Sequence, residues 1–170
     1  SSCSVYGQPE AVPVTEAENL KPESVYGASI ILTAQVLGWF GICHGLQHVA
    51  LRYFNASGAA ANGSLGDEYK PASRIIPMLM EYLLGQRPRF LINGDDYPTP
   101  DGTCIRDYIH VDDLATAHVA ALRYLAAGNP SEPFNLGTGQ GHSNWEIVDM
   151  VRQVTGLDFQ VQIGPHRHGD

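Results

Sequence analysis

Apolar residues along the chain alternate between helix-like and strand-like patterns. From Ser24 to about Gly41, apolar residues recur at helical spacing, and Ser24 is a typical residue for a helix start. The run at 48–54 is short and mostly apolar, as in a buried strand. The same reasoning predicts helices at 71–84, 112–127 and 144–156, and strands at 89–92, 105–110 and 159–163. Such alternation of strands and helices is typical of α/β proteins.

Polar residues and glycines define where several of these elements begin and end. Ser143 followed by Glu146 forms the pattern of a capping box at the start of a helix. Asp112 is expected to cap the helix at 112–127. The proline and Asp-Gly signals at 97–103 predict turns, and the glycine-rich run at 137–141 predicts a loop from a strand to a helix.

Composition excludes several classes of function. The chain has 170 residues, of which 44% are hydrophobic and 16% charged, with a net charge of −8. No basic stripe is present, so nucleic acid and anionic membranes are not expected partners. No stretch is expected to have the length of a membrane-spanning helix. The three cysteines form neither a Cys-x-x-Cys pair nor a disulfide framework, which indicates a reducing, cytoplasmic setting. The histidines lack the spacing of ligands, so no metal site is expected.

The strongest candidate chemistry lies at the start of the first predicted helix. Residues four apart on a helix share a face, and an ammonium beside a phenol lowers the pKa of the phenol. A tyrosine followed four residues later by lysine can therefore act as a general base near neutral pH. Here Tyr26 is present, but Ile30 stands at the lysine position. The only lysines are Lys21 and Lys70, and neither lies on this helix.

The chain resembles the UDP-glucose 4-epimerases and close sugar-nucleotide epimerases of the extended short-chain dehydrogenase/reductase superfamily. The resemblance covers the chain from its first residue to its last, and the run from Asp96 to Val111 is its most specific part. The segments that carry it are Ser1–Gly7, Ser24–Ile30, Leu51–Ala59, Asn93–Val111, Phe134–Gly139 and Arg167–Asp170.

The resemblance implies a function and a set of site residues. The family interconverts UDP-glucose and UDP-galactose through a transient 4-keto sugar, with NAD as the hydride carrier. It implies Tyr26 as general base and cofactor contact, and Ser2 as hydrogen-bond partner of the sugar hydroxyl. It also implies a homodimeric parent enzyme. The substrate-binding residues that it implies are Asn55, Arg106 and Arg167 for the diphosphate and Asp170 for the uridine ribose. A salt bridge of Arg106 to Asp107 or Asp101 is the alternative interpretation of that arginine.

The resemblance also predicts the organisation of the chain. No G-x-x-G-x-x-G run is present, so the nucleotide-binding turn of the family is missing. We interpret the chain as an internal fragment: part of a Rossmann-like parallel sheet with helices, plus part of a small α+β substrate-binding lobe. Residues 1–55 and 112–137 are assigned to the NAD-binding domain, and residues 56–111 and 138–170 to the sugar-nucleotide lobe.

Three functions remain open from the sequence. The first is a sugar-nucleotide 4-epimerase fragment, itself expected to be inactive because of Ile30. The second is a related dehydratase, which requires an acidic pair after the serine, whereas Ser2 is followed by Cys3 and Ser4. The third is a non-catalytic relative that binds a sugar nucleotide without turning it over.

Overall fold

The computed structural model describes residues 1–166. The chain divides into two compact units, the first formed by residues 1–56 and 108–140 and the second by residues 57–107 and 141 onward. Both units combine helices with short sheets, so the predicted α/β class is confirmed. The chain passes between the units three times: inside strand β2 (Asn55–Ser57), inside strand β4 (Ile105–His110) and between Gln140 and Gly141.

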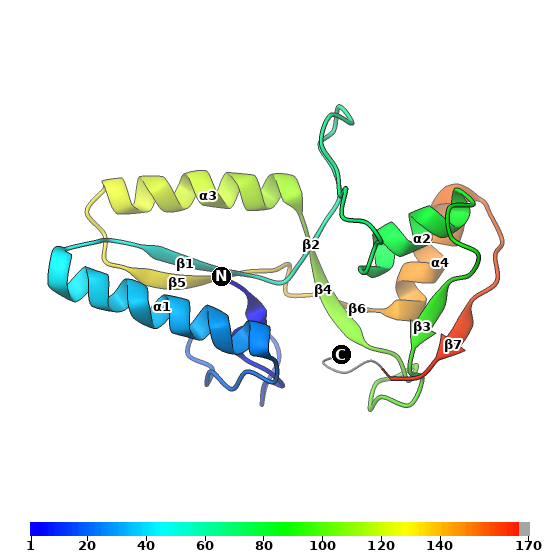
Figure 1. The fold of residues 1–170 in the computed structure, drawn as a ribbon, viewed down its shortest axis with the longest axis horizontal. Coiled ribbons are helices and arrows are strands. Elements are labelled where there is room, and N and C mark those ends of the chain that lie inside the picture. The colour runs from blue at the N-terminus through cyan, green and yellow to red at the C-terminus, as the bar shows by residue number, and fades with distance from the viewer. Residues whose placement is uncertain (167–170) are drawn as a thin grey trace. The chain divides into compact units, whose positions relative to one another are not determined.

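The first unit is built on a pair of parallel strands. Strand β1 (Val49–Tyr53) pairs with β5 (Glu132–Leu136), with Leu51 opposite Phe134. Helix α1 (Val25–His44) and helix α3 (Val111–Ala126) lie on opposite faces of this pair (Figure 1). A short 3₁₀ helix, η1 (Cys3–Val5), packs against α1. The predicted helices at 24–41 and 112–127 are therefore present, with ends shifted by up to three residues.

Two expectations for this unit are wrong. The N-cap of α3 is His110, whose Nδ1 accepts a hydrogen bond from the Asp112 amide at 3.1 Å, so Asp112 lies inside the helix. Helix α1 has 20 residues and is long and apolar enough to cross a membrane by length and composition. A single helix of this kind is only weak evidence for a membrane span, because helices of other origin share this length and composition.

A buried hydrogen-bond network holds the loop between η1 and α1 to the ends of the two strands. Tyr6 is 2% exposed, and its hydroxyl accepts from Arg52 Nη1 at 2.6 Å and donates to Asn135 Oδ1 at 2.7 Å. Asn135 in turn binds the loop, because its side-chain amide donates to the Val14 carbonyl at 3.0 Å and its backbone amide to Glu16 Oε1 at 2.7 Å. One phenol therefore links β1, β5 and the loop.

Replacing Tyr6 with phenylalanine is expected to lower the free energy of unfolding of the first unit by about 1–3 kcal/mol, because Arg52 and Asn135 each lose a buried partner. The matched control is Tyr124→Phe, since the Tyr124 hydroxyl donates to Glu132 at an exposed site, at 3.1 Å. We expect that control to cost less than about 0.5 kcal/mol. Hydrogen exchange of the β1 and β5 amides measures both variants, and equal effects would contradict the assigned role of Tyr6.

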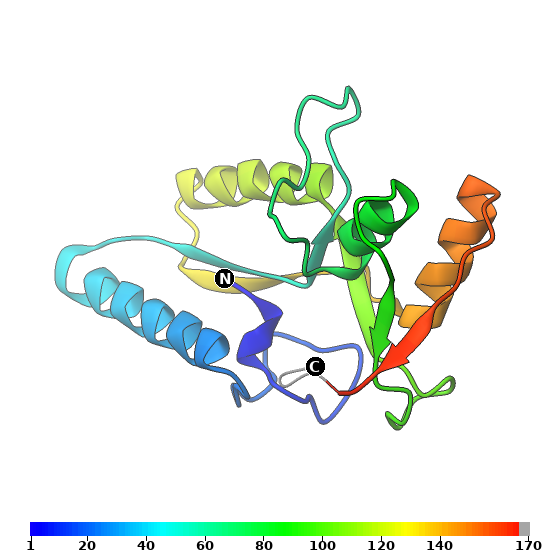
Figure 2. The same ribbon diagram turned by 45° about the vertical axis from the view of Figure 1, so that its right-hand side comes forward.

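The second unit has its own core. Strand β3 (Leu91–Asn93) pairs in parallel with β7 (Gln162–Gly164), and helices α2 (Ile75–Leu83) and α4 (Asn144–Thr155) pack against this pair (Figures 1 and 2). The fully buried residues of the cluster are Leu79, Phe90, Ile92 and Val148. Strand β6 (Gly141–Ser143) pairs antiparallel with β4, in a sheet of order β2-β4-β6.

Some predicted boundaries in this unit differ from the structure. The helix expected from Pro71 begins at Ile75, because Ala72 is held in the preceding loop by hydrogen bonds to Glu81 and Arg87. The strand expected at 159–163 begins at Gln162, where pairing with β3 starts. The glycine-rich run at 137–141 leads into strand β6 and not directly into a helix, which corrects the predicted strand-to-helix loop.

Candidate active site

Ser2 lies beside the carboxyl end of strand β1. It forms a parallel bridge with Tyr53, the last residue of that strand. Its hydroxyl caps η1 by accepting hydrogen bonds from the Ser4 amide at 3.2 Å and from the Ser4 hydroxyl at 2.9 Å. These bonds place Ser2 at the carboxyl end of β1, and the carboxyl ends of parallel strands are where ligands bind in open α/β folds.

Tyr26 lies in the first turn of α1, which packs on η1. Ser24 caps the helix by accepting from the Gly27 amide at 3.0 Å. Gly27 is buried, and a Cβ built on it would lie 2.5 Å from the Ser4 carbonyl oxygen. The segments that carry Ser2 and Tyr26 are thus in direct contact. The Tyr26 side chain is 58% exposed, so its phenol is accessible to a ligand.

No cation accompanies Tyr26 on its helix. Ile30, one turn further on, is partly buried, and α1 contains no lysine or arginine. Lys21 lies in the preceding loop, where its ammonium pairs with Glu10 at 2.9 Å. Helix α1 therefore supplies the phenol of a tyrosine–lysine pair without the ammonium that would activate it.

The four predicted substrate-binding residues are spread over both units. Asn55 is the first residue of β2 and belongs to the first unit, whereas Arg106 on β4 belongs to the second. The Arg106 guanidinium donates to the Ile105 carbonyl at 3.0 Å. Arg167 and Asp170 lie outside the described residues.

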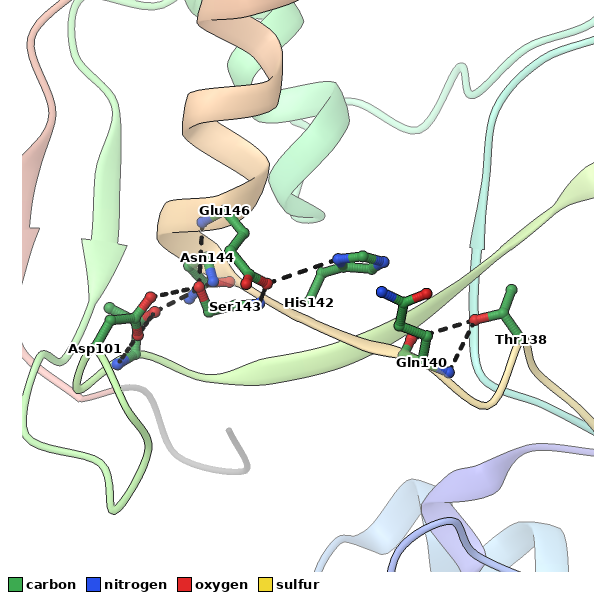
Figure 3. Close-up of polar contacts among 8 residues, drawn as sticks. Asp101, Thr138, Gln140, His142, Ser143, Asn144 and Glu146 are labelled. Carbon is green, nitrogen blue, oxygen red and sulfur yellow. Dashed lines mark hydrogen bonds and ion pairs between the residues drawn. The ribbon is translucent and has the colours of Figure 1, made fainter.

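Asp101 accepts hydrogen bonds from the residues that start α4 and precede β4 (Figure 3). The sequence patterns did not predict this role. Ser143 donates its hydroxyl proton to Asp101, and the same hydroxyl accepts from the Glu146 amide at 3.1 Å. Asp101 also accepts from the amide and the hydroxyl of buried Thr103, at 2.9 and 2.8 Å. The spacing of Asp101 and Thr103, an acceptor two residues before a donor, is the sequence signal for this turn.

These hydrogen bonds change the acidity of Asp101. Partial burial raises the pKa of this carboxyl, but the hydrogen bonds from Ser143 and Thr103 outweigh burial and hold the pKa below its usual value. Because the pKa of this carboxyl is lower in the folded protein than in the unfolded chain, its ionised form stabilises the fold. This contribution is complete at pH values above the pKa of the unfolded chain. It is lost as the pH falls through the pKa of the folded protein.

Asp101→Asn is therefore expected to lower the stability of the second unit by about 1 kcal/mol at pH 7, because the carboxylate is exposed enough for solvent to weaken its bonds. Below about pH 4 the difference from wild type should shrink, since the wild-type carboxylate is then being protonated. Unfolding between pH 2 and 7, monitored by Trp145 fluorescence in a Trp39→Phe background that removes the other tryptophan, measures this effect. A difference that grows on acidification would contradict it.

Comparison with known proteins identifies the family. The family model described as "NAD dependent epimerase/dehydratase family" matches residues 1–137. The chain belongs to this family. It is 45% identical over all 170 residues to the UDP-glucose 4-epimerase of Lacticaseibacillus casei and 46% identical to that of Azospirillum brasilense. It covers 51% and 49% of these two proteins, so it spans about half the length of the curated relatives it matches.

Solved epimerase structures share the fold of this family member. The UDP-glucose 4-epimerase from Brucella ovis in complex with NAD superposes on the whole chain with a TM-score of 0.93 at 44% identity, and the chain covers 52% of it. The enzyme from Bifidobacterium longum in complex with NAD⁺ and UDP gives a TM-score of 0.93 at 36% identity, with 51% covered. The resemblance inferred from the sequence motifs is thus confirmed.

The described residues fit one part of an NAD site and not another. Tyr26 is exposed at the start of a helix that packs against the segment of Ser2, and the family resemblance implies a cofactor contact for it. The glycine-rich run at 137–141 does not form a pyrophosphate-binding turn, because strand β6 separates it from α4. Two of the first three amides of α4 are already bonded, that of Asn144 to the Cys104 carbonyl and that of Glu146 to Ser143. They are not free to bind a phosphate.

Proposed function

We propose that the chain is the tyrosine-bearing and substrate-binding part of a UDP-glucose 4-epimerase, which interconverts UDP-glucose and UDP-galactose in galactose metabolism. The observation that carries this proposal is the contact between the Ser2 segment and the first turn of α1, which holds the two candidate catalytic residues together. We further propose that the chain alone is inactive, because it lacks both the pyrophosphate-binding turn and a lysine at position 30.

Each proposed residue has a defined task at the sugar nucleotide. Tyr26 removes the proton of the C4 hydroxyl as general base, and Ser2 donates a hydrogen bond to the same oxygen as negative charge develops on it. Arg106, Asn55 and Arg167 bind the diphosphate, for which the fork of a guanidinium is well suited. Asp170 accepts hydrogen bonds from the uridine ribose. A bound NAD would supply reversible hydride transfer at C4.

A non-catalytic sugar-nucleotide-binding protein is the second candidate, and Ile30 is the observation that favours it. This alternative keeps the roles of Arg106 and Asn55 but assigns no proton transfer to Tyr26. A dehydratase is less well supported, because Cys3 and Ser4 stand where an acidic pair is needed. Epimerase activity of a variant with lysine at position 30 distinguishes the epimerase from the non-catalytic binding protein.

The exposed surface of α1 supports a homodimer as the state of the complete enzyme, which we place in the cytoplasm. The helix carries no charged side chain, and Leu32, Val36 and Trp39 on it are largely exposed. Their spacing of four and three residues is that of helices packed side by side. A second copy of α1 would cover this surface. Sedimentation of the complete enzyme tests the proposal, and a monomer would contradict it.

Titration of the 170-residue chain with UDP tests the substrate assignment. We expect weak binding that Arg106→Ala weakens by about tenfold, the effect of losing a charge-assisted hydrogen bond to phosphate. The control is Arg123→Ala, because Arg123 lies on the exposed last turn of α3 and should leave the affinity unchanged. Equal affinities for the wild type and Arg106→Ala would overturn the assignment of Arg106. Tight binding of NAD by this chain would contradict the proposal that it lacks the pyrophosphate-binding turn.

A further inference from the structure

The residue opposite Arg106 in the sheet is a histidine. Strands β4 and β6 pair antiparallel, and their register places Arg106 directly across from His142. Directly opposed residues point to the same face of a sheet, with their Cβ atoms about 5 Å apart. A phosphate held by the Arg106 guanidinium is therefore within reach of the His142 imidazole. Both residues belong to the second unit, so this juxtaposition is internal to that unit.

The imidazole of His142 is oriented by α4. Its Nδ1 lies 3.6 Å from Glu146 Oε2, and the same carboxylate accepts the Ser143 amide in the capping box at 2.9 Å (Figure 3). The carboxylate is thus bonded at the helix start and lies within ion-pair distance of Nδ1. Nε2, on the other side of the ring, is the nitrogen left to donate to a ligand.

Other charged groups around His142 do not replace this pair. Asp107 is next to Arg106 along β4, so its side chain points to the opposite face of the sheet. Asp101 is bound to Ser143 and Thr103. Strand β2, on the other side of β4, carries no charged residue. Among the described residues, the charged side chains closest to the imidazole are therefore those of Arg106 across the sheet and Glu146 on α4.

We propose that His142 is a second, protonatable contact for the diphosphate, and that binding of a UDP-sugar adds one proton from solvent to its imidazole. The inference rests on the proposed function and deepens it. Arg106 and His142 are directly opposed in the sheet, so a diphosphate bound by Arg106 lies near the imidazole and attracts its protonated, cationic form. Histidine is the side chain that can take up such a proton between pH 5 and 8.

The consequence is a substrate affinity that rises as the pH falls. If binding adds one proton, the association constant increases by up to about tenfold for each unit of pH over the range in which the free imidazole is neutral. UDP-glucose is the suitable probe, because both of its phosphoryl groups are esterified and it does not titrate in this range. UDP has a terminal phosphate that titrates near pH 6, as phosphate monoesters do, and would obscure the effect.

The test is the dissociation constant of UDP-glucose for the 170-residue chain, measured by NMR titration from pH 5.5 to 8.5. The wild type is expected to bind severalfold more tightly at pH 6 than at pH 8. His142→Asn should bind with a pH-independent affinity close to that of the wild type at pH 8. Glu146→Gln retains a capping box, because glutamine serves at that position, but it removes the stabilising charge. It should move the pH dependence to lower pH. His44→Asn, at the exposed end of α1, is the control and should match the wild type.

The outcomes separate this inference from the proposed function. Binding that depends on Arg106 but shows no pH dependence overturns the role of His142 and leaves the substrate assignment intact. A pH dependence that persists in His142→Asn also overturns it, because another group must then take up the proton. Absence of UDP-glucose binding at every pH overturns both the inference and the proposed function.

Discussion

Replacing Ile30 with lysine is expected to raise epimerase turnover by at least about tenfold. A cation one helical turn from Tyr26 stabilises the phenolate, and each unit by which the pKa of a general base falls towards neutrality is worth about 1.4 kcal/mol, or a factor of ten. The side chain at position 30 is only partly buried, so an ammonium placed there remains accessible to solvent and to a ligand. The penalty for burying a charge is correspondingly small.

A chimera provides the setting for this measurement. Residues 1–170 would replace the matching stretch of the Lacticaseibacillus casei relative, which supplies the other half of the fold. The rate of conversion of UDP-galactose to UDP-glucose is then compared with isoleucine and with lysine at position 30. Circular dichroism and NAD content serve as controls for folding. A chimera with Ile30 that is already as fast as the Lacticaseibacillus casei enzyme would mean that another group activates Tyr26.

The second large effect is expected at Gly27. Its Cβ position lies 2.5 Å from the Ser4 carbonyl oxygen and 2.9 Å from Pro22 Cβ, and backbone atoms cannot move aside cheaply. Gly27→Ala should force α1 away from η1 and lower the free energy of unfolding of the first unit by about 1–3 kcal/mol. Because Tyr26 precedes Gly27, the same shift should move the phenol away from Ser2 and lower the activity of the chimera that carries lysine at position 30.

Gly38→Ala is the matched control in the same helix. A Cβ at Gly38 has no neighbour within 4 Å among the described residues, so only helix propensity changes. Alanine is favoured over glycine in a helix by about 1 kcal/mol, and this variant should be slightly stabilised. Hydrogen exchange of the α1 amides compares the two. The same sign of effect for both substitutions would contradict the packing that we assign to Gly27.

Local sequence patterns predicted the features that depend on residues close to one another in the sequence. The helix at 24–41 follows from its Ser24 cap and its high content of apolar residues, which lie all around the helix instead of on one face, and the capping box of Ser143 and Glu146 is present as predicted. The buried strand at 48–54 corresponds to β1. The two helix starts depend on neighbouring residues along the chain, so spacing and residue type are sufficient to identify them, whereas β1 also depends on its pairing with β5.

Features that depend on distant residues could not be predicted in this way. Strand β6 has only three residues and exists because it pairs with β4. The role of Asp101 depends on Ser143, 42 positions away, and the burial of Tyr6 depends on Asn135, 129 positions away. His110 caps α3 in place of Asp112 because the helix begins one residue earlier than the spacing suggested. Each difference reflects tertiary contacts that a single sequence does not reveal.

Some residues of the candidate site could likewise be named from sequence motifs, and others only from the structure. Motifs nominated Tyr26, Ser2, Asn55, Arg106, Arg167 and Asp170, and their catalytic and binding roles stay predictions. The motifs gave no indication of Gly27, whose packing places Tyr26, or of His142, which the register of β4 and β6 places opposite Arg106. Both depend on backbone geometry, which becomes visible only when two distant segments are placed together.

The most direct test of the central claim is a double-mutant cycle between positions 26 and 30 in the chimera. The claim is that Tyr26 is the general base and that Ile30 deprives it of its activating cation. Turnover of UDP-galactose would be measured for the unchanged chimera, for Ile30→Lys, for Tyr26→Phe and for the variant that combines both substitutions. We predict that lysine raises turnover only when Tyr26 is present, which gives a coupling free energy of at least about 1.4 kcal/mol. An equal gain from lysine in the Tyr26→Phe background would contradict the claim.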